Sequence, residues 1–197
     1  MTPGFFAAAS AEIDESADIG LGTKIWQGGV IREHATLGRE CVVGRNAYVD
    51  AGVRIGDRCK IQNHALLYAP AVLADGVFIG PAVVLTNDHN PRAVTPAGAL
   101  KNAQDWQAVG VTIDEGASIG ARSVVLGGIR VGRWALVGAG AVVTRDVPAH
   151  ALVVGVPAKQ VGWVGRDGRR LHQVDSTTWQ SFSGELFNVT THGLGPA

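Results

Sequence analysis

The chain has 197 residues, a length that suits one domain with a sizeable hydrophobic core. Hydrophobic residues make up 46% of it and charged residues 17%, which indicates a globular protein and argues against intrinsic disorder. The 17 basic residues balance 17 acidic ones, so the neutral chain offers no electrostatic surface for nucleic acid or for an anionic membrane.

The first residues, MTPGFFAAASAEID, contain an apolar run from Phe5 to Ala9. This run lacks the positively charged start and the length of a secretory leader, so we expect no signal peptide. No segment reaches the roughly 18 apolar residues of a membrane span. The two cysteines, Cys41 and Cys59, do not have the spacing of metal ligands. Together these features predict a cytoplasmic protein.

A six-residue repeat runs through most of the chain. Every sixth residue from Ile13 to Leu85 is isoleucine, leucine or valine, and the series resumes from Ile113 to Val143. Neither the helical period of 3.6 nor the alternation of a single strand produces a strict period of six. Such fixed self-similarity indicates a repeat architecture, in which each unit buries its apolar side chains against its neighbours.

Two other positions of the repeat have a preferred composition. The residue after the aliphatic one is often glycine, as at Gly44 and Gly56, and we expect it to adopt the unusual dihedral angles of a tight corner. The fifth residue is mostly small, which suits a narrow and fully packed interior. If three repeats form one coil, residues 18 apart stack about 4.8 Å from each other. Cys41 then lies beneath Cys59, and we expect two buried thiols rather than a disulfide.

The repeat is interrupted by a long segment, residues 86–112. Structureless loops of this length are uncommon in compact domains and usually carry function. Asn87, Asp88, His89 and Arg92 stand at its start and form the densest cluster of reactive side chains in the chain. We therefore expect the loop to hold the functional site; the alternative is a solvated polar loop.

The repeat pattern ends after Val143, where Pro148 and Pro157 break it. We expect a β-helix domain over residues 1–164 and a C-terminal tail over residues 165–197. The tail has three large aromatic residues that could pack onto the end of the β-helix as a cap, namely Trp179, Phe182 and Phe187. The alternative is a partly disordered tail.

The Ile-Gly repeats, the single long loop and the closing segment GAGAVVTRDVPAHALVVGVPAK resemble the hexapeptide-repeat acyltransferases over residues 11–164. The resemblance implies an all-β fold, a left-handed parallel β-helix with one long loop insertion and a short C-terminal extension. It also implies a homotrimer that binds acetyl-CoA in clefts between its subunits.

Three segments narrow this resemblance, namely IGDRCKIQNHALLY (55–68), FIGPAVVLTNDHNPRA (78–93) and VGVPAKQVGWV (154–164). They resemble bacterial nucleotide-sugar N-acetyltransferases, in particular those that acetylate the 3-amino group of a UDP-linked diamino-glucuronate or of dTDP-linked 3-amino-dideoxyhexoses. The resemblance implies an acetyl-CoA-dependent N-acetyltransferase that acts on the 3-amino group of a UDP- or dTDP-linked amino-sugar. O-acetylation of a sugar or of another small acceptor is the alternative among enzymes of this type.

Two further alternatives come from other classes of protein. The γ-class carbonic anhydrases share this architecture, but their zinc needs three histidines, and Tyr68 and Pro81 stand where such histidines would be expected. We therefore expect no metal. A non-catalytic β-helix scaffold is the other alternative, although it would not need the long loop.

The candidate catalytic residues are Asn87, Asp88 and His89. The resemblance places Asn87 against the sugar amine, and the repeat stacks it above Ala69 and Ala51, whose small side chains leave room for a sugar. His89 departs from the related enzymes, which often have a different residue at this position. A neutral imidazole could take the proton that the amine must lose. Otherwise the substrate itself or a water would have to accept that proton.

The candidates for binding the nucleotide or a carboxylate of the acceptor are Arg45, Gln62, Asn63, His64, Tyr68 and Arg92. Some of them could come from a neighbouring subunit. The candidates for binding acetyl-CoA, through backbone groups or through its phosphates, are Gly127, Gly128, Ala139, Gly140, Arg145 and Lys159. The role of Lys159 is implied by the closing PAK of the family pattern.

Overall fold

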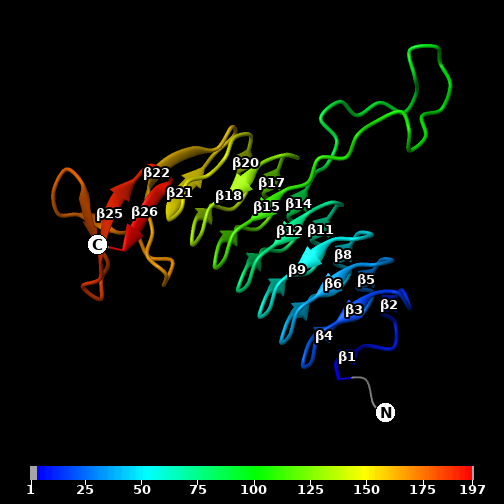
Figure 1. Ribbon diagram of the computed structural model, residues 1–197, viewed down its shortest axis with the longest axis horizontal. Coiled ribbons are helices and arrows are strands. Elements are labelled where there is room, and N and C mark those ends of the chain that lie inside the picture. The colour runs from blue at the N-terminus through cyan, green and yellow to red at the C-terminus, as the bar shows by residue number, and fades with distance from the viewer. Residues whose placement is uncertain (1–3, 197) are drawn as a thin grey trace.

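The computed structural model describes residues 4–196 as an elongated stack of short strands. Figure 1 shows the coils following one another along the long axis, from the N-terminal end in blue to the C-terminal end in red. Strands are the regular elements of the described residues, and no helix among them is long and apolar enough to cross a membrane.

Three sheets of parallel strands form the three sides of the coil. Sheet A contains, in order, β1 (Phe6–Ala7), β4 (Lys24–Ile25), β7 (Val42–Val43), β10 (Lys60–Ile61), β13 (Phe78–Ile79), β16 (Ser118–Ile119), β19 (Leu136–Val137), β21 (Ala151–Val154) and an antiparallel last strand, β22 (Lys159–Trp163). Sheet B contains β2 (Glu12–Ile13), β5 (Val30–Ile31), β8 (Tyr48–Val49), β11 (Leu66–Leu67), β14 (Val84–Leu85), β17 (Val124–Val125) and β20 (Val142–Val143). Sheet C contains β3 (Asp18–Ile19), β6 (Thr36–Leu37), β9 (Arg54–Ile55), β12 (Val72–Leu73), β15 (Thr112–Ile113) and β18 (Arg130–Val131).

The pairing register confirms the predicted stacking. Ile61 of β10 pairs with Val43 in the coil below and with Ile79 in the coil above, each 18 residues away. Across the long loop the spacing changes but the frame is kept, because Leu85 of β14 pairs with Val125 of β17. Each coil therefore takes three six-residue repeats and adds one strand to each sheet, which makes the fold a parallel β-helix.

The interior is built from the two inward positions of each repeat. From β4 to β20 the aliphatic residue that ends each strand is buried, as at Ile61, and so is the small fifth residue, as at Ala65, whereas Ile13 and Ile19 in the first coil are only half-buried. The thiols of Cys41 and Cys59 are buried and free, and each lies 3.1 Å from a backbone carbonyl oxygen. The predicted inward frame and the expected pair of buried thiols are both confirmed.

The glycine that follows the aliphatic residue is needed for a different reason than the one predicted. The positive φ angles of the corners occur two residues later, for example 53° at Asn46 and 60° at His64. At Gly44 a Cβ atom would instead stand 2.6 Å from the backbone nitrogen of Asn63 in the next coil. Glycine is required at this position by the close approach of two coils, so the prediction of unusual dihedral angles there was wrong.

The loop insertion leaves the β-helix after β14 and returns at β15. It spans residues 86–111, one residue fewer than expected, because Thr112 already pairs with Val72. In Figure 1 it projects from the stack as a green arm. Its outer part folds into a short hairpin in which Val94 pairs with Leu100. The loop therefore interrupts the coil without shifting the frame of the repeats.

The C-terminal segment forms an antiparallel cap sheet of four strands, β23 (His172–Gln173), β24 (Thr178–Gln180), β25 (Leu186–Thr190) and β26 (Gly193–Pro196). Phe187 of β25 is buried against the imidazole of His150, with the ring centroids 5.0 Å apart. Trp179 packs partly buried beside it, whereas Phe182 is 83% exposed. Of the three aromatic residues expected to pack onto the β-helix, Phe187 does so, Trp179 packs within the cap sheet's own cluster, and Phe182 is exposed.

Candidate functional site

Sheet B lies between the two corners that carry the predicted site residues. We call the turn from sheet A to sheet B the A–B corner and the turn from sheet B to sheet C the B–C corner; the long loop leaves from the B–C corner. The first residue of each strand of sheet B points outward. From β5 onward these outward residues form an apolar, half-buried strip, the sheet B strip, which consists of Val30, Tyr48, Leu66, Val84, Val124 and Val142.

Asn87 is held at the B–C corner by three contacts. Its Nδ2 donates a hydrogen bond of 2.7 Å to the carbonyl oxygen of Ala69, one coil below. Its own carbonyl oxygen accepts a bond of 2.9 Å from the N–H of Val109, which closes the base of the loop. Its Cα lies 3.3 Å from the point where a Cβ atom of Gly127 would stand. Because a carbonyl oxygen can only accept, the amide faces Ala69 with its nitrogen and keeps Oδ1 as an acceptor.

His89 lies beside the same corner. Its Nε2 is 3.6 Å from the point where a Cβ atom of Gly128 would stand, so no side chain separates the imidazole from this coil. The neighbouring Gly127 is tied to the start of the loop, because its N–H donates a bond of 3.1 Å to Oγ1 of Thr86. The structure thus brings the predicted catalytic residues Asn87 and His89 next to two of the glycines predicted to bind acetyl-CoA.

Four residues were expected to bind pantetheine through their backbone, and the N–H groups of three of them are engaged within the chain. Besides the bond of Gly127, the N–H of Gly128 donates 3.0 Å to the carbonyl oxygen of Gly110, and that of Gly140 donates 2.8 Å to Ala121. A pantetheine amide at these residues would therefore have to donate to their carbonyl oxygens. Of the backbone contacts to pantetheine that the sequence led us to expect, those through carbonyl oxygens therefore remain at these three residues.

Asp88 and Arg92 belong to the loop arm rather than to the corner. Oδ1 of Asp88 accepts a hydrogen bond of 2.8 Å from the N–H of Asn90, as in a local turn. Asp88 and Arg92 both line a hollow of about 450 Å³ within the loop, together with Lys101 and Trp106. The two predicted residues therefore lie together, in a pocket that adjoins Asn87 along the chain.

A polar network formed mainly by residues that were not predicted for the site supports the B–C corner from below. Asp50 accepts hydrogen bonds of 2.8 Å from the Tyr48 hydroxyl and 3.1 Å from the N–H of Ala69. Arg32 donates a bond of 3.0 Å to the same hydroxyl, and the ring of the predicted Tyr68 lies 5.7 Å from that of Tyr48. Burial alone would raise the pKa of Asp50, but the backbone and hydroxyl hydrogen bonds outweigh it and lower this pKa. The spacing of 18 predicts that Arg32, Asp50 and Tyr68 stack in successive coils, but it does not predict the hydrogen bonds made by Tyr48 and Ala69.

The other predicted acceptor residues lie at the A–B corner, on the opposite edge of sheet B. Oδ1 of Asn63 accepts a bond of 2.9 Å from the N–H of Arg45, and the N–H of His64 donates 2.9 Å to the Arg45 carbonyl oxygen. Gln62 is half-buried and follows β10 directly. Within one chain the structure therefore does not bring these four residues to Asn87.

The predicted acetyl-CoA residues are divided in the same way. Arg145 is exposed at the B–C corner, one coil and 18 residues beyond Gly127. Ala139 and Gly140 are exposed at the A–B corner. The N–H of Ala158 donates a hydrogen bond to the carbonyl oxygen of Val142, the first residue of β20. Lys159, the next residue, therefore also lies on the A–B side of sheet B. Each edge of sheet B therefore carries part of the predicted acceptor site and part of the predicted donor site.

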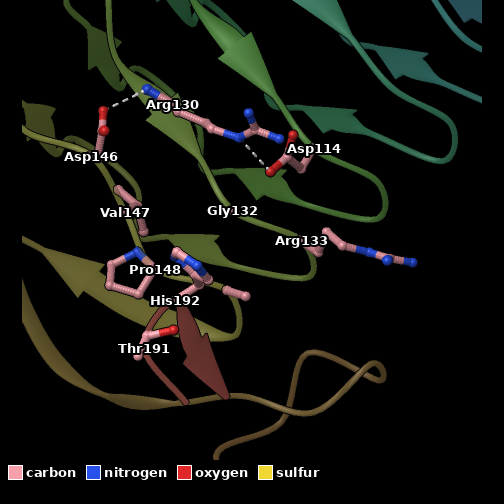
Figure 2. Close-up of a pocket in the computed structure, with 10 residues that line it drawn as sticks. Asp114, Arg130, Gly132, Arg133, Asp146, Val147, Pro148, Thr191 and His192 are labelled. Carbon is pink, nitrogen blue, oxygen red and sulfur yellow. Dashed lines mark hydrogen bonds and ion pairs between the residues drawn. The ribbon is translucent and has the colours of Figure 1, made fainter. Parts of the chain in front are cut away.

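A further hollow of about 560 Å³ lies between sheet C and the turn that joins β25 to β26. Figure 2 shows Arg130 reaching toward Asp114, with an Nε–Oδ2 distance of 2.9 Å, while Asp146 accepts a bond of 2.8 Å from the Arg130 N–H. His192 lies beside Pro148 at its other side. None of the predicted site residues lines this hollow, and throughout residues 4–196 no three His, Cys, Asp or Glu side chains gather closely enough to hold a metal ion.

Comparison with known families matches two segments of the chain. Residues 34–69 and 110–145 match the family described as Bacterial transferase hexapeptide (six repeats). The segments lie in the coiled body on either side of the loop, so the match rests on the same repeats that build sheets A, B and C.

Two curated relatives show how local the sequence likeness is. The serine acetyltransferase of Salmonella typhimurium is 41% identical over 95 residues, which is 48% of this chain and 34% of the relative. The dTDP-3-amino-3,6-dideoxy-alpha-D-galactopyranose 3-N-acetyltransferase of Aneurinibacillus thermoaerophilus is 47% identical over 64 residues, 32% of this chain and 33% of the relative. The chain thus spans about a third of the length of the curated relatives it matches.

Two solved structures share the fold. LpxA, a UDP-N-acetylglucosamine acyltransferase from Bacteroides fragilis, superposes with a TM-score of 0.65 at 18% identity, over 81% of this chain and 61% of that chain. The acetyltransferase domain of PglB from Neisseria gonorrhoeae in complex with acetyl coenzyme A gives 0.50 at 23% identity, over 80% and 58%. The matched repeats are those of the bacterial transferase hexapeptide family, and the chain folds as a left-handed parallel β-helix, as the sequence predicted.

Proposed function

We propose that this protein is an acetyl-CoA-dependent acetyltransferase whose acceptor is the 3-amino group of a UDP- or dTDP-linked amino-sugar. The observation that carries the proposal is the orientation of Asn87. Its Nδ2 is bound by the Ala69 carbonyl oxygen, so its Oδ1 remains to accept an N–H from an amine. The Aneurinibacillus relative, whose name specifies a dTDP-linked 3-amino-sugar, supports the same class of acceptor.

The reaction requires a neutral amine. An amine that arrives as an ammonium ion must lose a proton before its nitrogen attacks the thioester carbonyl carbon, and His89 offers a base at the same corner as Asn87. The C–N bond forms and the C–S bond breaks. The ammonium ion loses two protons in all: the first leaves to the solvent by way of the base, and the second, released when the amide forms, goes to the departing thiolate of CoA. The products are the N-acetylated sugar and CoA, with no other reactant needed.

Acetyl-CoA would lie along the coils above Asn87. Gly128 is exposed beside the His89 imidazole, so a thioester that lies along this coil would be near the base, whereas Gly127 is buried against Val109. Arg145 adds an exposed guanidinium one coil further on, and this group suits a phosphate. The PglB domain, which was solved with acetyl coenzyme A, supports this donor.

We also propose that the protein is a homotrimer with its active sites between subunits. The sheet B strip is apolar and only half-buried, so an assembly would remove more of its apolar surface from water. A three-fold axis that faces sheet B closes into a ring and brings the A–B corner of one subunit beside the B–C corner of the next. Such a ring would unite the two groups of predicted residues that one chain holds apart.

The acceptor class is tested with purified protein, acetyl-CoA and a panel of UDP- and dTDP-linked sugars, following CoA release and product mass. We expect one acetyl group on a 3-amino-sugar and none on the matched sugar with a 3-hydroxyl group. Serine belongs in the same panel, because the Salmonella relative makes acetyl transfer to serine or a similar small acceptor the second candidate. Acetylation of serine, or of the 3-hydroxyl sugar, without any amino-sugar product would overturn the first proposal.

The shared site is tested by mixing two variants, each of which lowers activity by damaging one corner. Asn87→Ala disables the B–C corner, and Arg45→Ala combined with Lys159→Ala disables the A–B corner. If each site joins corners of two subunits, every mixed trimer formed by co-expression contains one intact site, so activity returns. Mixed trimers, verified by native mass spectrometry, that stay inactive would contradict the shared site, as would a monomer that turns over.

A further inference from the structure

We propose that Asp50 is a positioning residue that orients the amide of Asn87 through Ala69. This inference rests on the proposed function, because it assigns Asn87 to the acceptor amine. It goes further by giving a role in catalysis to a carboxylate that lies one coil below Ala69 and does not itself contact Asn87.

Asp50 and Asn87 hold the same residue from opposite sides. Oδ2 of Asp50 accepts the N–H of Ala69 at 3.1 Å, and the carbonyl oxygen of Ala69 accepts Nδ2 of Asn87 at 2.7 Å. Both backbone polar groups of Ala69 are therefore used, one by the carboxylate below and one by the amide above. Any movement of Ala69 is transmitted directly to the side chain of Asn87.

The backbone ladder is weakest where this link is made. The N–H of Tyr68 lies 3.4 Å from its acceptor in the next coil, whereas the equivalent bonds of Asp50 and Thr86 are 3.0 and 2.9 Å long. The carboxylate of Asp50 supplies the restraint that the ladder lacks here. An equivalent bond is made two coils above Asp50, where Oγ1 of Thr86 accepts the N–H of Gly127 at 3.1 Å.

Asp50 is itself fixed. Its Oδ1 accepts a bond of 2.8 Å from the hydroxyl of Tyr48, and this hydroxyl accepts one of 3.0 Å from Nη1 of Arg32. Glu33 holds the guanidinium of Arg32 with two contacts of 2.6 Å. A chain of five side-chain and backbone groups therefore runs from Arg32 to Asn87, and its members leave the carboxylate little freedom to turn.

Loss of this restraint would act on the acceptor site through the orientation of one amide. If Ala69 shifts, Asn87 can rotate its side chain and present N–H groups instead of Oδ1 to the substrate amine. An amine that needs an acceptor would then meet a donor, and the attacking nitrogen would lose its alignment with the thioester. Misplacement of a reacting group by about 1 Å can lower a rate by about a hundredfold.

The first test compares Asp50→Ala with Asp57→Ala. Asp57 is a matched control, because its Oδ1 also accepts a hydrogen bond from the next coil, at 2.7 Å from the N–H of Arg39. This bond lies at the corner between sheets C and A, away from the loop. We expect Asp50→Ala to lower kcat for the amino-sugar by about tenfold or more while KM for acetyl-CoA stays unchanged. Asp57→Ala should leave kcat at the wild-type value. An equal effect of both variants would mean that Asp50 only stabilises the fold, and would overturn the proposal.

The second test separates positioning from charge. Asp50→Asn keeps an oxygen for the N–H of Ala69 and an N–H for the Tyr48 hydroxyl, so we expect it to restore most of the activity lost in Asp50→Ala. A variant Asp50→Asn as impaired as Asp50→Ala would show that the negative charge matters instead, and would refute positioning.

A readout without turnover keeps this inference separable from the proposed function. The side-chain NH₂ signals of Asn87, assigned by their loss in Asn87→Ala, should shift or broaden in Asp50→Ala but not in Asp57→Ala. If the wild type acetylates no amine, the proposed function fails while the NMR result still decides whether Asp50 orients Asn87. Unchanged Asn87 signals in Asp50→Ala would overturn the positioning role whatever the substrate is.

Discussion

Gly127 lies directly against Val109, so closely that a Cβ atom on Gly127 would stand 2.5 Å from the Val109 carbonyl oxygen. The same Cβ atom would lie 3.3 Å from the Cα of Asn87. Both ends of the loop therefore pack on Gly127 in the next coil. The two ends also bond to each other, because the Asn87 carbonyl oxygen accepts the N–H of Val109 at 2.9 Å. This contact sets the distance between the base of the loop and the coil that carries Gly128.

Gly127→Ala should therefore damage the site more than the fold. The added methyl group would push Val109 away by about 1 Å, and a shift of that size at a reacting centre costs about a hundredfold in rate. Overpacking of this kind typically lowers the free energy of unfolding by about 1–3 kcal/mol. We expect a large fall in kcat/KM, measured by steady-state kinetics, in a protein that remains folded by urea titration.

Gly56→Ala is the matched control for that variant. Its Cβ atom would stand 2.8 Å from the backbone nitrogen of Asp75, in the same kind of contact between coils but away from the loop. It should lose a comparable free energy of unfolding and keep kcat/KM. If both variants lose activity alike, the effect belongs to the stack and not to the base of the loop.

Asn87→Ala should lower kcat/KM for the amino-sugar at every pH. Removal of the amide takes away the only side-chain acceptor that we assign to the amine, and a lost hydrogen bond of this kind costs about tenfold or more. Asn90→Ala, three residues along the same loop, is the control and should behave as wild type. The measurement is kcat/KM from pH 6 to pH 9, and a profile that merges with wild type at either end would contradict a pH-independent contact.

His89→Ala should instead change the shape of the pH profile. A general base contributes about 10²–10⁴-fold, so kcat should fall near neutral pH while the affinity for the acceptor stays nearly constant. A more alkaline buffer should partly restore kcat, because the amine then loses its proton to the solvent. If the variant turns over like wild type from pH 6 to pH 9, the substrate itself or a water handles the proton.

The fold could be predicted because every coil repeats the same environment. An inward position such as Ile61 meets the residue 18 before it and the residue 18 after it, so a period of six specifies both the burial and the register. The glycine positions were predicted for the wrong reason, because the sequence shows a turn but not how closely two coils approach. Gly44, for example, is constrained by Asn63 in the coil above.

The site could be predicted only in part, because it depends on contacts that the period does not describe. Thr86 and Gly127 are 41 residues apart and bond across the loop, a distance that no repeat of 18 anticipates. Asn63 and Tyr68 are close in sequence but lie at opposite edges of sheet B, because a short strand separates their corners. Residues that the family resemblance grouped together are therefore divided within one chain.

Lys159→Ala should weaken the binding of acetyl-CoA and spare the amino-sugar. Lys159 lies at the C-terminal end of the A–B corner, beyond the coils that carry the acceptor residues, and a charge-assisted bond to phosphate is worth about tenfold in affinity. Lys60→Ala, an exposed lysine of sheet A, is the control and should change neither affinity. Calorimetry with each ligand decides the matter, and equal losses for both ligands would contradict this division.

The last prediction concerns His150, which joins the β-helix to the cap sheet. Its imidazole is buried, packs against the ring of Phe187 at a tilt of 58° and hydrogen-bonds through Nδ1 to the Val164 carbonyl oxygen at 2.9 Å. Burial lowers the pKa of His150 below its ordinary value, and the positive charges of Arg166 and Arg133 lower it further. The hydrogen bond to Val164 and the negative charge of Glu185 raise this pKa, but by less. The protonated ring is thus disfavoured in the folded protein.

The sign of the pH dependence follows from this difference. Below the ordinary histidine pKa of about 6.5 the unfolded chain binds a proton at His150 more readily than the folded chain does, so acidification favours unfolding. We expect the free energy of unfolding of the wild type to fall between pH 7.5 and pH 5.5 more steeply than that of His150→Asn, which cannot titrate there. Asparagine also tolerates the φ of 63° at this position.

The exposed His64, with a φ of 60°, provides the matched variant His64→Asn, which should keep the wild-type slope. Urea unfolding at several pH values measures all three slopes, and a wild-type slope equal to that of His150→Asn would show that the junction with the cap sheet does not sense pH.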